Sequence, residues 1–259
     1  MTAPRSQKTI GLTLAIFGAL LLTPDTLFMR LSQLDGFNML LWRGGLSGLA
    51  YFMIWLWMRG PRDLSNIWTR NFAIIVACQT GNAALFSLAI ALAPVIVVLI
   101  GVATVPIFAA LLSRFLLGEA LSMRTLITAA MVFLGLFISV LGSDDGHLML
   151  DLTTLIGAGL GLGVAFSLAM NFTIIRKDKD VPFVLAIAVG AIAAAGLAAV
   201  FATTLAWPAL PQMAAIALTG IFILPLSFVT LSYAARFVPS STVSLIMLLE
   251  TVLGPLWVW

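Results

Sequence analysis

The stretch IGLTLAIFGALLLTPDTLFMR, residues 10–30, begins as a continuous apolar run and then breaks its own pattern. The run is close to the roughly 20 residues that a helix needs to cross a bilayer. Pro24 removes a backbone hydrogen-bond donor, and the carboxylate of Asp25 is costly in hydrocarbon. The stretch therefore predicts a membrane-spanning helix, and it raises the question of what Asp25 does inside it.

The composition of the whole chain agrees with a membrane location. Hydrophobic residues make up 62% of the 259 positions, charged residues make up 9%, and the mean hydropathy is +1.15. Soluble domains carry about 25% charged residues. No segment is polar enough to fold as a separate soluble domain, so we expect an all-α polytopic membrane protein. The single cysteine, Cys78, excludes a disulfide framework and a thiolate metal site, and no cofactor is expected.

Charged clusters and prolines divide the chain into nine apolar spans. The predicted spans cover residues 10–29, 37–58, 71–92, 95–117, 124–142, 153–175, 182–204, 212–235 and 240–259. Alternate connections between these spans carry eleven of the 13 Lys and Arg residues, whereas the opposite set carries only Arg30. Cytoplasmic loops of membrane proteins are enriched in Lys and Arg. We therefore predict a multi-pass protein of the cell inner (cytoplasmic) membrane whose N-terminus is cytoplasmic.

The opening stretch has a second copy later in the chain. IGAGLGLGVAFSLAMNFTIIR, residues 156–176, aligns with it at an offset of 146. A second pair of segments, FSLAIALAPVIVVLI at 86–100 and LSYAARFVPSSTVSL at 231–245, aligns at an offset of 145. Chance similarity between apolar helices is the alternative explanation, but two separate matches at nearly one offset favour an internal repeat.

Each copy would contain five helices. An odd number of crossings makes the second copy enter the membrane from the opposite face, which is the inverted-topology repeat of many secondary transporters. We therefore predict two inverted five-helix repeats, residues 1–146 and 147–259.

Several short motifs, together with this arrangement, resemble the EamA-type branch of the drug/metabolite transporter superfamily. The motifs are PDTLFMR at 24–30, LWRGG at 41–45, LAPVIVVLIGVATVPIFAALLSRFLLGE at 92–119 and VPSSTVSLIMLLETVLGPLW at 238–257. The resemblance implies ten helices, a central cavity between the repeats, and alternating-access movement of small organic metabolites or drug-like molecules, with export as the expected direction. It does not identify a substrate.

The chain departs from the family pattern in two places. Gly118 and Glu119 close the fourth span, and the offset of 145 would put the partner of Glu119 near position 264. We therefore expect helix ten to be missing from this chain, which leaves the second repeat with four helices. Relatives often have Glu-Pro where this chain has Glu250 followed by Thr251, so the position of a helix break in the ninth span is not predicted.

Asp25 and Arg43 are predicted to lie at similar depth on consecutive antiparallel helices. Asp25 is five residues from Arg30, about 7 Å along a helix, and Arg43 is six residues from Phe37, about 9 Å. An ion pair would lower the cost that either charge alone suffers in a low dielectric. We predict that Asp25 holds Arg43, with direct substrate contact or snorkelling of Arg43 as the alternatives. Asn171, the repeat partner of Asp25, keeps the polarity without the charge.

The third span carries a polar face. Gln79, Asn82 and Phe86 follow i, i+3, i+7 spacing and so share one side of the helix. Two amides beside an aromatic ring suit a zwitterionic or amphipathic ligand, although amides in membranes also join neighbouring helices. Tyr233, in the corresponding part of the eighth span, is a weaker candidate for the same site because a tyrosine is readily accommodated by packing alone.

Glu250 is the deepest acid in the predicted spans. It lies eleven residues beyond Pro239, about 16 Å along the helix and close to the middle of a hydrocarbon core about 30 Å thick. Arginines are scarce at that level, so the neutral carboxyl form is favoured and a proton can exchange when the cavity faces water. We predict proton coupling or recognition of a cationic substrate group, with a protonated side chain bonded to a neighbouring helix as the alternative.

Motifs of other function classes do not occur in the sequence. There is no Walker A motif for ATP-driven transport, and no HExxH or GxSxG motif of an enzyme. His147 lies beside Asp144 and Asp145, where a solvated loop histidine is favoured over a metal ligand.

The net charge of +3 reflects membrane orientation, since no basic stripe with interleaved aromatics indicates nucleic acid. The expected partners are the bilayer and a small-molecule substrate, and a homodimer is left open. A non-transporting receptor or assembly subunit is the main alternative function, and a membrane-embedded enzyme is the weakest.

Overall fold

The computed structural model describes residues 5–58, 64, 66–120, 152–202, 205 and 207–258, with five further positions from 123 to 134. Every regular element in this part of the chain is a helix. The helices are α1 (Arg5–Leu22), α2 (Asp25–Ser32), α3 (Gly36–Met58), α4 (Arg70–Leu92), α5 (Val95–Val102), α6 (Val105–Leu117), α8 (Leu152–Lys177), α9 (Phe183–Phe201), α10 (Leu210–Ala217), the π-helical segment η2 (Leu218–Ile223), α11 (Leu224–Phe237) and α12 (Ser240–Val258).

These helices confirm the predicted all-α polytopic membrane fold. Seven helical segments of the described residues are long and apolar enough to cross a membrane, and Ser240–Gly254 forms a shorter apolar helix. Together they correspond to eight of the nine predicted spans. The fifth predicted span, residues 124–142, and the loop with His147 lie almost wholly outside the described residues.

Three spans are interrupted where prolines weaken the helix. A turn at residues 23–24 separates α1 from α2, and a turn at 103–104 separates α5 from α6, which has Pro106 in its first turn. The π-helical segment η2 comes directly before α11, which has Pro225 in its first turn. Proline cannot donate the backbone hydrogen bond of a continuing helix, and such breaks are common beside cavities in membrane transporters.

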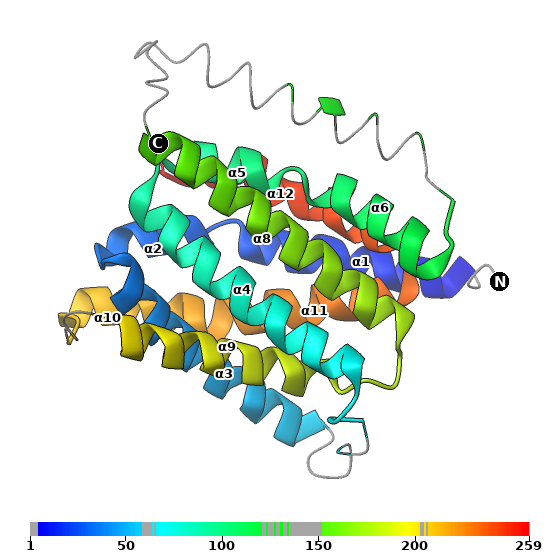
Figure 1. Cartoon of the computed structure of the whole chain (residues 1–259), viewed down its shortest axis with the longest axis horizontal. Coiled ribbons are helices and arrows are strands. Elements are labelled where there is room, and N and C mark those ends of the chain that lie inside the picture. Colours follow the sequence, from blue (N-terminus) through cyan, green and yellow to red (C-terminus); the bar gives the residue numbers. More distant parts are fainter. Residues whose placement is uncertain are drawn as a thin grey trace.

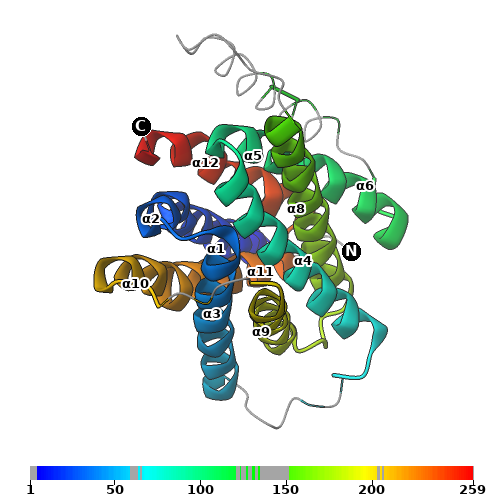
Figure 2. The same ribbon diagram turned by 60° about the vertical axis from the view of Figure 1, so that its left-hand side comes forward.

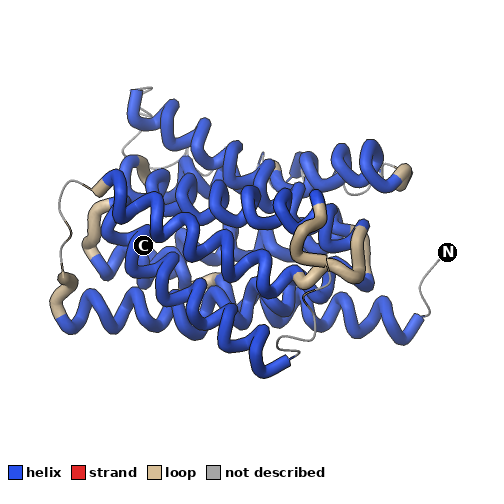
Figure 3. Tube along the Cα trace, turned by 60° about the horizontal axis from the view of Figure 1, so that its bottom comes forward, coloured by secondary structure: helices blue, strands red, loops and turns tan. Residues whose placement is uncertain are grey.

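The helices run side by side in one bundle (Figure 1), and the described loops lie at its two ends (Figure 3). Within the bundle α3 packs against α9, α4 against α8, and α1 against α11; Figure 2 shows α3 and α9 next to each other. In the predicted repeat α1 corresponds to α8, α3 to α9, and α4 to α11. The repeat therefore relates the α4–α8 contact to the α11–α1 contact, and it relates the α3–α9 contact to itself. These contacts are the ones that such a repeat would produce, and the repeat itself and its boundary at 146/147, which lies outside the described residues, stay predictions.

Two glycines allow α5 and α8 to approach closely. A Cβ added to Gly161 would lie 2.6 Å from the carbonyl oxygen of Val98, and one added to Gly101 would lie 2.9 Å from the backbone of Gly161. Real Cβ atoms do not come so close to backbone atoms, so any larger residue would push the helices apart. Small residues at such contacts are typical of helix pairs in membranes.

The described basic side chains on the connections gather mainly at one end of the bundle, here called the basic end. Arg176 forms an ion pair with Glu119, with 2.6 Å between Nη2 and Oε1, and Arg236 donates to the carbonyl oxygen of Val181. Arg30, by contrast, donates to the carbonyl oxygen of Ala93, between α4 and α5. This separation of charge is the one predicted, and the cytoplasmic assignment of the basic end remains a prediction.

Candidate functional site

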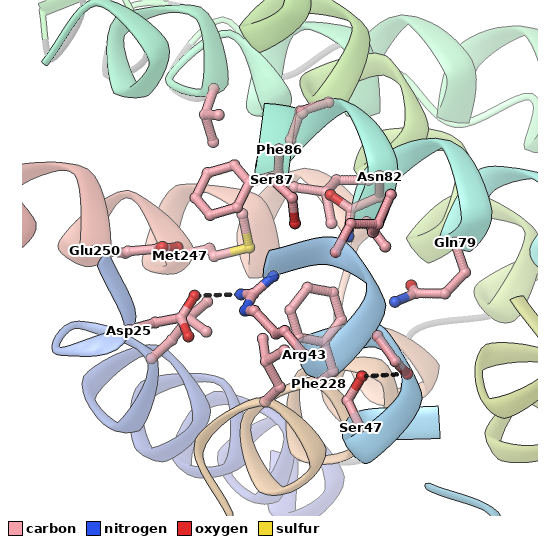
Figure 4. Close-up of a pocket in the computed structure, with 18 residues that line it drawn as sticks. Asp25, Arg43, Ser47, Gln79, Asn82, Phe86, Ser87, Phe228, Met247 and Glu250 are labelled. Atoms are coloured by element: carbon pink, nitrogen blue, oxygen red, sulfur yellow. Dashed lines mark hydrogen bonds and ion pairs between the residues drawn. The ribbon is translucent and has the colours of Figure 1, made fainter. Parts of the chain in front are cut away.

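A cavity lies inside the bundle, where helices from both predicted halves converge. Helices α2, α3, α4, α8, α11 and α12 all contribute side chains to its wall. Figure 4 shows the charged and amide side chains of this wall around one common space. The polar residues of the lining are Asp25, Arg43, Ser47, Gln79, Asn82, Ser87 and Glu250.

The predicted ion pair between Asp25 and Arg43 is present in this wall. Arg43 Nη2 donates to Asp25 Oδ2, and the two side chains are only 6% and 1% exposed. Because the helix breaks at Pro24, Asp25 becomes the first residue of α2, where the positive end of the helix dipole favours a carboxylate. The guanidinium carbon of Arg43 also lies 5.7 Å from the centre of the Phe86 ring, within cation–π range.

The ion pair of Asp25 and Arg43 does not use every polar atom of the two side chains. In the described part of the chain, neither Asp25 Oδ1 nor Arg43 Nε has a hydrogen-bond partner, and both atoms are buried. A carboxylate can accept through both oxygens, and a guanidinium has five donors. The ion pair therefore neutralises two charges without using all of their hydrogen-bonding capacity.

The predicted polar face of α4 also forms part of the cavity. Gln79, Asn82 and Phe86 all line it and all are buried. Gln79 has a second contact, because Asn171 Nδ2 donates to Gln79 Oε1 at 3.3 Å. Asn171 lies behind Gln79 and is not part of the lining. Gln79 thus fits both predicted roles, as a polar lining residue and as a link between α4 and α8.

Glu250 lines the same cavity as the ion pair, which corrects one prediction. The sequence suggested that arginines are scarce at its depth and that no other acid lies so deep, whereas the structure places Arg43 and Asp25 around the same space. Figure 4 shows Asp25 and Glu250 on neighbouring segments, with the Arg43 guanidinium directed at Asp25. Counting residues along separate helices estimates depth but cannot show which side chains converge laterally.

Comparisons with known proteins indicate to which family the chain belongs. The model of the EamA-like transporter family matches residues 9–141, which is just over half of the chain. The chain belongs to the EamA-like transporter family. A solved crystal structure described only as that of a protein is similar, with a TM-score of 0.78 and 20% identity over 97% of this chain and 86% of that chain. This likeness concerns the fold alone. No curated protein matches the sequence.

Tyr233 of this EamA-family chain does not lie in the central cavity, contrary to the prediction. Its ring packs edge-on against Phe183, with 5.1 Å between ring centres, and it lines a different cavity at the basic end. The repeat aligns Tyr233 with Leu88, nine residues after Gln79. At about 100° per residue, nine residues make about two and a half turns, so this position lies on the opposite side of the helix from Gln79.

The sequence-based prediction also missed other residues of the cavity wall, among them Ser47, Met247, Ser87 and Phe228. Ser47 lies one helical turn after Arg43, and Met247 lies one turn before Glu250, so their spacing could have identified them. Ser87 directly follows Phe86, and its buried hydroxyl has no hydrogen-bond partner among the described residues. Phe228 had no comparable signal, because its position depends on how the helix that follows η2 is rotated.

Proposed function

We propose that this protein is a secondary transporter that moves small organic molecules through the central cavity by alternating access. Membership of a transporter family supports movement across the membrane. The observation that carries the proposal is the convergence of Asp25, Arg43 and Glu250 on one cavity. Ionisable groups inside a membrane are costly, and they commonly mark the pathway of a substrate or ion.

Glu250 is the proposed coupling residue. Arg43 is engaged by Asp25, so the carboxyl group of Glu250 can respond to a proton or to a cationic group of the substrate. When the cavity opens toward one face, water reaches Glu250 and a proton can leave or enter. Substrate and proton then alternate at one carboxyl group, which links their movements in opposite directions.

The rest of the cavity wall suits a molecule with one charged group and an apolar body. Gln79, Asn82 and Ser47 offer hydrogen bonds, while Phe86 and Phe228 provide aromatic surface. The direction proposed is export, from the basic end across the cell inner membrane, with the N-terminus in the cytoplasm.

Flux and binding in liposomes with an imposed pH gradient test this proposal. The full-length protein is reconstituted and screened with amino acids, nucleosides and cationic drugs. We expect at least one class to be transported with a rate that depends on the gradient. Glu250→Gln keeps the shape and hydrogen bonding of the side chain but cannot titrate, so transport by this variant should lose its dependence on the gradient.

Glu119→Gln is the matched control, because Glu119 pairs with Arg176 at the basic end and does not line the central cavity. It should keep the wild-type dependence on the pH gradient. Substrate binding without flux in the wild-type protein would indicate a receptor and would overturn the transporter proposal. Wild-type rate and pH dependence in Glu250→Gln would reject the coupling role.

A further inference from the structure

A second cavity lies at the basic end, where α3 and α11 end and α9 begins. Six of its lining residues carry the argument below: Trp55, Lys179, Asp180, Phe183, Tyr233 and Arg236. These helix ends lie toward the side of the bundle that carries the N-terminus (Figure 1). The cavity is therefore placed where the predicted cytoplasmic surface of the membrane would be.

This basic-end cavity is separate from the central cavity. The two share no lining residue, although α3 contributes to both, through Ser47 in the central cavity and Trp55 in the second. Tyr51 lies between them on the same face of α3, since each step is four residues. Its side chain is 1% exposed, and its hydroxyl donates to the carbonyl oxygen of Leu224 at 3.1 Å. Tyr51 thus fills the space between the cavities.

Aromatic rings and cations share the wall of the second cavity. The guanidinium carbon of Arg236 lies 4.6 Å from the centre of the Phe183 ring and 5.7 Å from that of the Tyr233 ring. Its Nη2 donates to the carbonyl oxygen of Val181 at 3.0 Å, so the guanidinium is held in place. Lys179 is exposed at the rim, and Asp180 is an acid of the same lining. A fixed cation over rings and a second, exposed cation form a surface that is both charged and apolar.

The indole of Trp55 is buried against this cavity. Trp55 is 6% exposed, and its Nε1 has no hydrogen-bond partner among the described residues. The indole N–H can only donate, and buried donors are nearly always paired. This donor is buried and not exposed to the cavity, so Trp55 contributes ring surface to the wall, and Arg236 and Lys179 are the side chains that attract an acid group.

We propose that the basic-end cavity binds the acid group of an amphipathic anion. The carboxylate or phosphate lies near Lys179 and Arg236, and the apolar body lies against Trp55, Phe183 and Tyr233. Charge-assisted hydrogen bonds from arginine to such groups are strong and directional. A soluble organic acid and the headgroup of an anionic lipid share this chemistry, since basic pockets between membrane helices at the cytoplasmic side also bind lipid headgroups. The proposal goes beyond the transport function, because it involves no residue of the central cavity.

Fluorine NMR titration of para-fluorophenylacetate tests the site, with the full-length protein in phosphatidylcholine nanodiscs. We expect saturable binding in the wild-type protein, and no competition from benzyl alcohol, which lacks the acid. Arg236→Gln should weaken binding about tenfold and Lys179→Gln about threefold, because each removes a charged donor. Arg236→Lys keeps the charge and should retain part of the affinity. Arg114→Gln, at an exposed basic-end position outside both cavities, is the matched control and should bind like the wild-type protein.

Nanodiscs that contain phosphatidylglycerol distinguish the two sources of the acid. Competition by this lipid indicates a headgroup site, and unchanged binding of the probe indicates a site for soluble acids. Lys179 is exposed, so Lys179→Gln keeps the test valid even if Arg236→Gln fails to fold. Non-saturable binding, or wild-type affinity in Lys179→Gln and in folded Arg236→Gln, would overturn the proposal.

Discussion

The segments α1–α2 and α8 are the two aligned copies in the predicted repeat, yet only the first is broken. The turn at residues 23–24 interrupts the first copy, whereas α8 continues without a break from Leu152 to Lys177. At the aligned positions the first copy has Pro24 and Asp25, and the second has Met170 and Asn171. The broken copy presents a charge to the central cavity, while the continuous copy presents an amide to a neighbouring helix.

The difference shows how two aligned segments can contribute differently to one site. Asp25 pairs with Arg43 at the cavity wall, and Asn171 bonds to Gln79 behind that wall. A proline that ends one helix also creates a new helix N-terminus, and this N-terminus stabilises a carboxylate that an unbroken helix would not. Pro24 thus places Asp25 at a helix N-terminus, where a carboxylate is stabilised, whereas the aligned Asn171 lies inside a continuous helix.

Removing the charge from the broken copy should have the largest effect. Asp25→Ala leaves the buried guanidinium of Arg43 without its partner, which we expect to destabilise the protein by about 3–5 kcal/mol. The double variant with Arg43→Ala should be less damaged than the sum of the two single variants, because no charge is then left unpaired. Thermal unfolding of all three variants in detergent measures this coupling, and additive losses would contradict it.

Adding a charge to the continuous copy should be the next most damaging change. Asn171→Asp places a carboxylate in α8 with no described cation beside it, and we expect a loss of about 2–3 kcal/mol at neutral pH. Asn171→Ala, which removes only the bond to Gln79, should cost about 1 kcal/mol. Thermal unfolding again provides the measurement. Equal stability of the two variants would show that α8 tolerates a charge as well as α2 does.

Repairing the break should alter transport more than stability. Pro24→Ala restores a backbone donor, so α1 and α2 can join and carry Asp25 away from Arg43. A displacement of about 1 Å can cost a positioned group up to about 100-fold in rate, and we expect a loss of about tenfold in transport. Pro106→Ala, at the start of α6, changes a proline outside the cavity lining and is the control. Similar losses in both variants would argue against a specific role for the break at Pro24.

The smallest effect is expected at the loop that follows the broken copy. Partial burial acts to raise the pKa of Asp35, but hydrogen bonds from the Asn38 side chain and from the backbone N–H groups of Asn38 and Phe37 together lower it below the ordinary value. The unfolded chain then binds a proton more readily, so stability is greater above the ordinary pKa and is lost as the pH falls through the lowered one.

Asp35→Asn should remove this part of the acid dependence. Because Asp35 is exposed, we expect a change of only about 0.5 kcal/mol between neutral and strongly acidic pH. Unfolding temperatures of the wild-type protein and of Asp35→Asn, compared from pH 6 to pH 3 at roughly constant salt, measure it. Parallel curves for the two proteins would contradict the role of Asp35 at the start of α3.

The sequence by itself determined the class of fold and part of the site. Apolar runs of membrane length predict spans because the bilayer forces backbone groups to be satisfied within each helix. Depth along consecutive helices also predicted the pair of Asp25 with Arg43, since two neighbouring buried charges of opposite sign stabilise each other. The spacing of Gln79, Asn82 and Phe86 predicted one polar face, because helical periodicity is a local property.

Only the tertiary structure decided which of these features meet in one place. Glu250 joins Asp25 and Arg43 because α12 packs against α2, a contact between residues more than 200 positions apart that no local pattern encodes. Tyr233 instead joins Phe183 and Arg236 at the basic end, since the rotation of α11 turns it away from the central cavity. Rotation and lateral packing depend on side chains from several helices at once. The sequence of one helix predicts how deep a residue lies and which side of the helix carries it. The neighbouring helices determine which residues that side contacts.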